Sequence, residues 1–419
     1  MNALFDYRIN EQIETDVAVV GGGTAGVFAA IAAARSGAKT VLIEKNSTLG
    51  GTMTVSNVNF PGLFFAWGRQ IIDGPCWEAI QRTADLGGAV IPPMQFKPQN
   101  HFDEQITLNR FAYTAVLWEM LEEAGVTVIT SAMVSAVEET DTEVCLLVTA
   151  KEGLLRVCAK AAVDATGDAN LVQIAGYGVE KSETQQPATL QNHISGYDMN
   201  SIDEDALKKA FPEEAFVSYI TADKLIHWLH RGRINVHVPC EHADTSAGKT
   251  RTEQDAYALL LKILRFYRRI PGLENLTVDF VAEETGIRES NRIVGEQTIL
   301  AEDYIRGRAY PNAVCYAFYP IDLHVMTGIR QQFFEENVVG QIPYGALIPK
   351  NAKRLLCAGR CIASDTDANS AVRVQAPCMA TGQAAGCAAA ICARKKIPVW
   401  QLPHSLLREK LNAIGAIVP

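Results

Sequence analysis

The chain has 419 residues, a formal net charge of -9 and a pI of about 5.5, and hydrophobic residues make up 48% of it. This length is enough for roughly two or three domains with substantial cores. The acidic balance argues against an extended nucleic-acid-binding surface, although it leaves room for a local basic pocket.

The N-terminal segment and the cysteines bear on the cellular compartment. Residues 1–16, MNALFDYRINEQIETD, lack a basic stretch followed by an apolar stretch, so we expect no signal peptide and a cytoplasmic location. The ten cysteines are scattered and include no C-x-x-C pair, which predicts no zinc or iron–sulfur site. Many of them lie in apolar runs, so we expect buried, reduced thiols.

The first predicted unit is a strand, a helix and a second strand. The run DVAVV is continuous and β-branched, which is typical of a buried parallel strand. The segment TAGVFAAIAAARSG predicts a helix that ends at Gly37, and AKTVLIE predicts the second strand. Together they form a βαβ unit at the start of the chain.

A glycine turn joins the first strand to the helix. Gly21, Gly23 and Gly26 form the pattern G-x-G-x-x-G, which permits a tight turn, close approach of a pyrophosphate and close packing of the helix. The helix N-terminus directs free N–H groups toward phosphate oxygens. Glu44, at the end of the second strand, can accept hydrogen bonds from ribose hydroxyls. We therefore predict a dinucleotide site, either NAD or FAD; a purely structural turn is the alternative.

The chain then passes through an irregular region into a helix and further strands. Residues 50–100 are rich in Gly, Pro and aromatic residues, which predicts irregular structure with one short helix. The segment ITLNRFAYTAVLWEMLEEAG predicts an amphipathic helix. Strands are predicted in VTVIT, AMVSAVEE, EVCLLVTA and LLRVCAKAAVDATGD.

A second domain follows, and the chain then returns to the first. Residues 191–340 mix strands (INVHVP, LTVDFVAE) with a helix (TEQDAYALLLKILRFYRRI). The return brings a strand in RLLCAGR and a small-residue helix with Pro377 at its first position. The apolar part of that helix is too short and too rich in small residues for a membrane span. The predicted fold is α/β: a discontinuous Rossmann-like domain with a parallel sheet (1–190 plus 341–419) and a mixed α+β substrate domain (191–340).

Three further segments carry a family resemblance: EKNSTLGGTMT, VDATGDAN and LLCAGRCIASDTDANSAVRVQAPCMATGQAAG. They resemble the glutathione-reductase-type FAD fold and, more closely, the FAD-dependent oxidoreductases related to the flavoprotein subunits of fumarate reductase and succinate dehydrogenase. The resemblance runs from about Thr15 to Arg394 and implies FAD as the cofactor. Succinate dehydrogenase subunits carry a histidine before the second glycine pair for covalent attachment. The segment KNSTLGG has none, so we expect non-covalent FAD.

The resemblance also implies which residues contact FAD. Glu44 would hold the adenosine ribose, the backbone of Val134 the adenine, and the start of the last helix the flavin pyrimidine ring. Arg360, beside the ribityl chain, departs from many members, which carry an acid there; Asp365 or a backbone contact would replace that acid. The implied cofactor-binding residues are Gly21, Gly23, Thr24, Ala25, Gly26, Glu44, Lys45, Gly50, Gly51, Thr52, Val134, Thr166, Gly167, Gly359, Arg360, Gln375 and Ala376.

Several features of related flavoproteins are missing from the sequence. No second G-x-G-x-x-G follows a strand, so we expect no built-in NAD(P)H domain, and no close cysteine pair follows the first helix. The acid–histidine–proline signature of the aromatic hydroxylases of this fold is missing too. The electron acceptor or donor is therefore expected to be external, with oxygen, a quinone and a partner flavoprotein all open.

His324 is the candidate proton carrier. In AFYPIDLHV it is flanked by aromatic and apolar residues, and the segment resembles the family's Ile-Asp-x-His segment near the flavin. A neutral imidazole there could take a proton from an alcohol or amine, or deliver one to an alkene. We expect Asp322 to diverge from His324, although both lie on one face of an extended strand. A structural core histidine is the alternative.

Two arginines are candidate substrate anchors. Arg288 could clamp a substrate carboxylate bidentately, and the alternative is an ion pair with Glu283, Glu284 or Glu289 nearby. Arg373 precedes the last helix and could pair with the reduced flavin or with a substrate carboxylate. Its alternative role is to fix the turn.

These residues predict an FAD-dependent oxidoreductase that passes hydride between flavin N5 and a small or medium organic substrate held between the domains. Two alternatives stay open: a flavoprotein with a structural or non-redox flavin, as in a hydratase or isomerase, and a non-enzymatic nucleotide-binding protein. We expect a small-molecule substrate, no nucleic-acid partner, no membrane span and no resident metal. A homo-oligomer is compatible with the sequence.

Overall fold

The computed structural model describes residues 8–94, 105–325 and 328–419. Residues 1–7 belong to the segment in which we expect no signal peptide, and they lie outside the described residues. Residues 95–104, at the end of the predicted irregular region, lie outside them as well.

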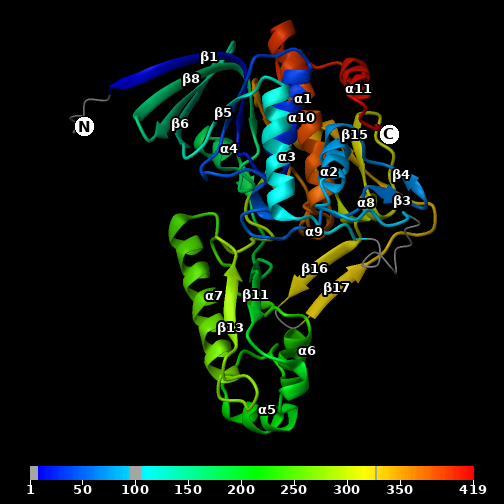
Figure 1. Cartoon of the computed structure of the whole chain (residues 1–419). Helices are drawn as coiled ribbons and strands as arrows, with labels where there is room; N and C mark the ends of the chain where they lie inside the picture. The colour runs from blue at the N-terminus through cyan, green and yellow to red at the C-terminus, as the bar shows by residue number, and fades with distance from the viewer. Residues whose placement is uncertain (1–7, 95–104, 326–327) are drawn as a thin grey trace.

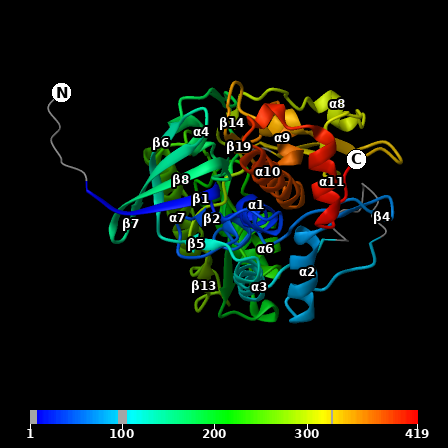
Figure 2. The same cartoon turned by 90° about the horizontal axis from the view of Figure 1, so that it is seen from above.

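A seven-stranded sheet forms the centre of the larger unit (Figures 1 and 2). β1, β2, β5, β8 and β19 run parallel, whereas β7 and β6 extend the sheet antiparallel beyond β8. This arrangement confirms the predicted α/β class with a parallel sheet. The strands lie in the order β5 (Thr127–Ile129), β2 (Thr40–Ile43), β1 (Ile9–Val20), β8 (Gly153–Asp164), β7 (Val144–Ala150) and β6 (Met133–Glu139), and β19 (Leu355–Cys357) also pairs with β8.

Two small-residue helices, α1 (Thr24–Arg35) and α10 (Gln375–Lys395), pack against each other beside the sheet. A Cβ atom at Gly386 would lie 2.0 Å from the carbonyl oxygen of Ala29, so only glycine allows this approach. By length and composition α10 could cross a membrane, but its most apolar 18-residue stretch is entirely buried inside the protein.

The predicted start of α10 is wrong by two residues. Pro377 is the third residue of the helix, because the helix begins at Gln375. Proline is tolerated there since the N–H groups of the first turn have no partner within the helix.

The helices predicted before the second domain are confirmed. α2 (Pro75–Asp85) is the short helix of the irregular region, and α3 (Arg110–Glu123) is the predicted amphipathic helix. α3 begins after Asn109, whose Oδ1 accepts a hydrogen bond from the backbone N–H of Ala112 at 3.0 Å.

A second hydrophobic core gathers residues between Ala188 and Ile287 and forms a separate lobe below the sheet unit in Figure 1. Buried residues from Ile293 onward pack into the first core. The lobe contains α5 (Glu204–Ala210), α6 (Ala222–His230) and α7 (Ser246–Tyr267), with the strand pairs β10 (Ala188–Leu190)/β12 (Val236–Val238) and β11 (Asn192–Ser195)/β13 (Thr277–Val281).

A hairpin of β16 (Ile321–Val325) and β17 (Gly328–Gln332) extends from the first unit toward this lobe (Figure 1). It lies within the predicted second domain, 191–340, although its buried start packs in the first core. The remaining elements are β3 (Phe65–Ala66), β4 (Arg69–Gln70), α4 (Asn170–Ile174), β9 (Val179–Glu180), β14 (Arg292–Ile293), α8 (Ala301–Ile305), β15 (Ala313–Ala317), β18 (Gly340–Pro343), α9 (Thr366–Val372) and α11 (His404–Ala413).

Two cysteines are joined by a disulfide, which corrects the expectation of reduced thiols throughout. Cys145 in β7 and Cys158 in β8 are paired in register across the antiparallel ladder, with their Cα atoms 4.2 Å apart. Directly opposite residues of such a ladder point to the same face of the sheet, so their side chains meet. The other eight cysteines are free and buried.

Candidate functional site

A cavity of about 1200 Å³ is lined by both units. Its first wall comes from the ends of β1, β2 and β8, the start of α1 and the start of α10. Its second wall comes from α6, β12, the start of α7 and the β16–β17 hairpin. Each of the three candidate catalytic residues lies on this cavity: His324, Arg288 and Arg373.

The glycine turn has the geometry that its pattern predicts. Gly21 has a φ of +101°, and a Cβ atom there would lie 2.5 Å from the carbonyl oxygen of Ala165. A Cβ atom at Gly26 would lie 1.7 Å from the carbonyl oxygen of Gly21, so α1 can approach the strand only without one. α1 has no side-chain cap, and its free N–H groups therefore remain available at the cavity, which Gly23 and Thr24 line.

Glu44 fixes the turn from the end of β2. Its Oε2 accepts a hydrogen bond from the backbone N–H of Gly22 at 2.5 Å, and its Oε1 accepts one from Asn46 N–H at 2.8 Å. Burial raises the pKa of this carboxyl, which these two hydrogen bonds partly oppose. Next to it, Lys45 pairs with Glu284 of the second lobe at 3.1 Å, which ties the two walls together.

Most of the predicted cofactor residues line the cavity, whereas Gly26, Gly50 and Ala376 do not. Gly26 packs against the turn, Gly50 against Thr54, and Ala376 donates its N–H to the carbonyl of Pro61 at 2.6 Å. Gln375 does line it and accepts a hydrogen bond from Thr24 Oγ1 at 2.7 Å. The lining members are Gly21, Gly23, Thr24, Ala25, Glu44, Lys45, Gly51, Thr52, Val134, Thr166, Gly167, Gly359, Arg360 and Gln375.

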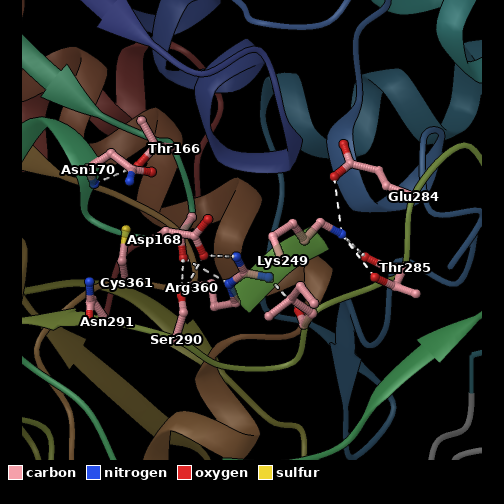
Figure 3. Close-up of polar contacts among 12 residues, drawn as sticks. Thr166, Asp168, Asn170, Lys249, Glu284, Thr285, Ser290, Asn291, Arg360 and Cys361 are labelled. Carbon is pink, nitrogen blue, oxygen red and sulfur yellow. Dashed lines mark hydrogen bonds and ion pairs between the residues drawn. The ribbon is translucent and has the colours of Figure 1, made fainter. Parts of the chain in front are cut away.

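Arg360 is held by a network that the sequence did not reveal (Figure 3). Its guanidinium pairs with Asp168 at 2.5 Å and donates to the carbonyl of Gly167 at 2.8 Å. Ser290 donates to the same Asp168 oxygen, Oδ1. Asp168 itself lines the cavity. Asp365 instead caps α9, where it accepts from Ala368 N–H at 2.7 Å, so it is not the acid at the cavity.

Asp322 and His324 form a hydrogen-bonded dyad, which corrects the expectation that they diverge. Both side chains project from one face of β16, and Asp322 Oδ2 lies 3.0 Å from His324 Nε2. Gln331 of the paired strand donates to Asp322 Oδ1 at 2.9 Å. Burial lowers the pKa of His324, while the bond to Asp322 acts to raise it. The imidazole is therefore neutral at neutral pH.

Arg288 and Arg373 are partly buried, and within the described residues neither has a carboxylate at ion-pair distance. The glutamates expected to pair with Arg288 are engaged elsewhere; Arg288 donates instead to the carbonyl of Pro187 and to Thr189 Oγ1. Arg373 donates to Gln186 Oε1 at 3.1 Å, and its Nε has no acceptor among the residues that the structure describes. Burial and the nearby Arg373 lower the pKa of Arg288 to about 9. Two partly buried cations at one cavity, without a carboxylate partner among the described residues, favour an anionic ligand.

His237 and Tyr219 are site residues that the sequence did not single out. Both line the cavity, and the ring centroid of His237 lies 6.3 Å from that of His324. Burial lowers the pKa of His237 to about 3, so it stays uncharged. The alternation of INVHVP carried the only sequence signal, since the buried valines at 236 and 238 direct His237 to the opposite face.

Comparison with known proteins gives a match along most of the chain. The profile of a family described as FAD dependent oxidoreductase matches residues 16–411. Short matches of 43 residues occur in mitochondrial dihydrolipoyl dehydrogenases, at 58% identity in Homo sapiens and in Mus musculus. They cover 10% of this chain and 8% of those relatives.

Solved structures with a similar chain course share little sequence with this protein. A geranylgeranyl bacteriochlorophyll reductase-like protein from Thermoplasma acidophilum is 16% identical, covering 96% of this chain and 83% of that one, with a TM-score of 0.48. The p-nitrophenol 4-monooxygenase of Pseudomonas putida DLL-E4 is 13% identical, covering 96% and 84%, with a TM-score of 0.47.

Proposed function

Because this chain belongs to the FAD-dependent oxidoreductase family, whose cofactor is FAD, we propose that it transfers hydride between flavin N5 and a small or medium organic substrate. Because the members of this family are oxidoreductases, the alternative of a non-enzymatic nucleotide-binding protein is excluded. The observation that carries the redox proposal is the Asp322–His324 dyad, which lies on the same cavity as the glycine turn.

The residues of the first wall suit a dinucleotide with a pyrophosphate. The uncapped N-terminus of α1 and the backbone of Gly21 and Gly23 would hold the phosphates. A Cβ atom at Gly51 would lie 2.8 Å from Gly23 Cα, so the two glycine segments leave a cradle that side chains would fill. Glu44, with its pKa raised by burial, would accept from the adenosine ribose.

Asp168 would supply the carboxylate that many family members carry at the position of Arg360. Its Oδ1 is occupied by Arg360 and Ser290, which leaves Oδ2 to accept from a ribityl hydroxyl. The ion pair with Arg360 keeps the carboxylate in position at the cavity. FAD is proposed to be bound non-covalently, and the protein is proposed to be cytoplasmic.

The flavin supplies the hydride acceptor or donor when it is bound, and the protein must manage the proton. If His324 donates Nε2–H to Asp322, its Nδ1 is the atom that can accept the substrate proton. Asp322 fixes this tautomer and orients the ring, as the carboxylate partner of a catalytic histidine does. Gln186 accepts from the backbone N–H of His324 at 3.0 Å and from Arg373, and so couples the proton carrier to an anchor.

Arg288 and Arg373 would bind a substrate carboxylate. Their guanidinium groups are desolvated and lack counterions among the described residues, so an anion would regain interactions that burial removed. This places the reacting carbon close to the dyad. An alcohol, amine or carbon–carbon bond next to a carboxylate would fit equally.

The visible spectrum of the purified protein tests this function. We expect flavin absorption that bleaches on anaerobic addition of a carboxylate-bearing donor, as it does with dithionite. A protein that takes up no FAD would overturn the cofactor assignment. A yellow protein that no organic acid bleaches, and whose reduced form no unsaturated acid reoxidises, would favour the structural or non-redox flavin.

A further inference from the structure

Three further cations line the cavity, and the described part of the chain gives none of them a counterion. Lys224, Arg231 and Arg233 lie at α6 and just after it, in the second lobe. None of them has a carboxylate at ion-pair distance in the described part of the chain. This contrasts with the net charge of -9 of the whole chain. A protein with an excess of acidic residues thus keeps an uncompensated basic wall on its cavity.

The acidic residues of the cavity cannot neutralise this wall, because each is already engaged. Each of these carboxylates is held by hydrogen bonds or an ion pair with a residue other than the three cations. The pairs are Glu44 with the N–H groups of Gly22 and Asn46, Asp168 with Arg360, Asp244 with Lys181, Glu284 with Lys45 and Lys249, and Asp322 with His324.

α6 and the residues just after it carry the three cations, with Lys224 and Arg231 about 10 Å apart along the helix axis. Lys224 and Arg231 are seven residues apart, so they lie on one face of the helix and its continuation. Lys224 is further fixed by donating to the carbonyl of Tyr219 at 2.7 Å. Burial and the like charge of Arg231 lower the pKa of the half-buried Arg233. A bound anion would relieve this repulsion.

A row of rings connects these cations to the dyad. The ring of His324 lies 6.3 Å from that of His237, which lies 5.8 Å from the ring of Tyr219, and Lys224 Nζ lies 5.5 Å from that ring. The backbone N–H of His237 donates to Tyr219 Oη at 2.8 Å, which fixes the phenol beside His237. A molecule whose reacting carbon lies at His324 must therefore extend along His237 and Tyr219 to reach Lys224.

We propose that Lys224, Arg231 and Arg233 form an outer anion subsite, which binds a phosphate or carboxylate group at the far end of an elongated substrate. The middle of that substrate packs along the rings of His237 and Tyr219, and its reacting carbon lies at His324. The inference rests on the proposed function and specifies its substrate class. It assigns the cations to the substrate and not to FAD, whose phosphates the α1 N-terminus would hold.

The test measures anion binding to the FAD-loaded enzyme by titration calorimetry, with pyrophosphate and citrate as probes. We expect the wild-type protein to bind the probes. The double variant Arg231→Gln/Arg233→Gln should lose at least about tenfold in affinity, because each charge-assisted contact is strong. The matched control is Lys208→Gln/Lys209→Gln, which removes the same charge from α5 at exposed sites off the cavity. The tighter probe shows whether the subsite prefers phosphate or carboxylate.

Four outcomes overturn the inference: no probe binds the wild type, the double variant binds as tightly as the wild type, the control loses as much affinity as the double variant, or the double variant loses FAD, which would assign the cations to the cofactor. FAD content and melting temperature are therefore measured on every variant. The proposed function fails separately. If the protein binds the anions as expected but no organic acid reduces its flavin, the anion subsite is retained and the proposed hydride transfer is wrong.

Discussion

At the scale of single residues, His324 and Asp322 make the most direct prediction. His324→Gln removes the proton acceptor and keeps a polar side chain of similar reach. We expect flavin reduction by the donor to slow by about 10²- to 10⁴-fold with FAD content unchanged. His193→Gln is the control, since His193 is exposed on β11 and off the cavity. A rate equal to that of the wild type would make His324 a structural histidine.

The pH dependence of the same reaction tests Asp322. Burial lowers the pKa of His324, so kcat/KM for substrate oxidation should fall with decreasing pH only below the ordinary histidine range. The bond from Asp322 acts to raise that pKa. Asp322→Asn should therefore move the acid limb of the profile to lower pH, besides slowing the reaction. An unmoved or upward-shifted limb would contradict the dyad.

At the scale of secondary-structure elements, the contact between α1 and α10 decides whether the glycine turn is in place. Helix propensity alone predicts that Gly386→Ala stabilises α10 by about 1 kcal/mol. The new Cβ atom would lie 2.0 Å from Ala29 O, however, and overpacking of this kind costs about 1–3 kcal/mol or more. We expect a lower melting temperature and weaker FAD retention. Gly328→Ala, whose Cβ meets no described atom within 4 Å, should leave both unchanged.

The pairing of β7 with β8 predicts the thiol content of the protein. Eight cysteines are free and two form the cross-strand disulfide. Titration in denaturant without reductant should therefore find eight thiols per chain, and ten after reduction. Cys145→Ser/Cys158→Ser should show eight under both conditions. Ten thiols in the unreduced wild type would restore the expectation drawn from the sequence.

At the scale of the whole molecule, FAD binding should stabilise the sheet unit, because the predicted contacts come from distant segments of that unit. A ligand that binds only the folded state at 100 times its Kd adds about 2.7 kcal/mol. We expect FAD, but not riboflavin, to raise the melting temperature of the apoprotein, since riboflavin lacks the pyrophosphate that the glycine turn would hold. Acid precipitation of the holoenzyme should release the yellow colour; a yellow pellet would indicate covalent FAD.

The sequence by itself determined the local features. The βαβ start, the turn of Gly21, Gly23 and Gly26, and the position of Glu44 follow from short-range rules, because strand period, helix period and glycine conformation depend on near neighbours. The same rules located α3 and the small-residue helix α10. Side-chain chemistry and the family resemblance singled out His324, Arg288 and Arg373, which the structure brings to one cavity.

Only the tertiary structure decided which side chains meet. The partnership of Arg360 with Asp168 joins residues 192 positions apart, and the disulfide depends on the register between β7 and β8. The bond between Asp322 and His324 depends on side-chain rotamers, which the strand pattern does not fix. Arg288 has no counterion among the described residues because its neighbouring glutamates pair with other elements. Sequence spacing fixes the face on which a side chain lies, whereas packing between distant segments fixes its partner and its exposure to water.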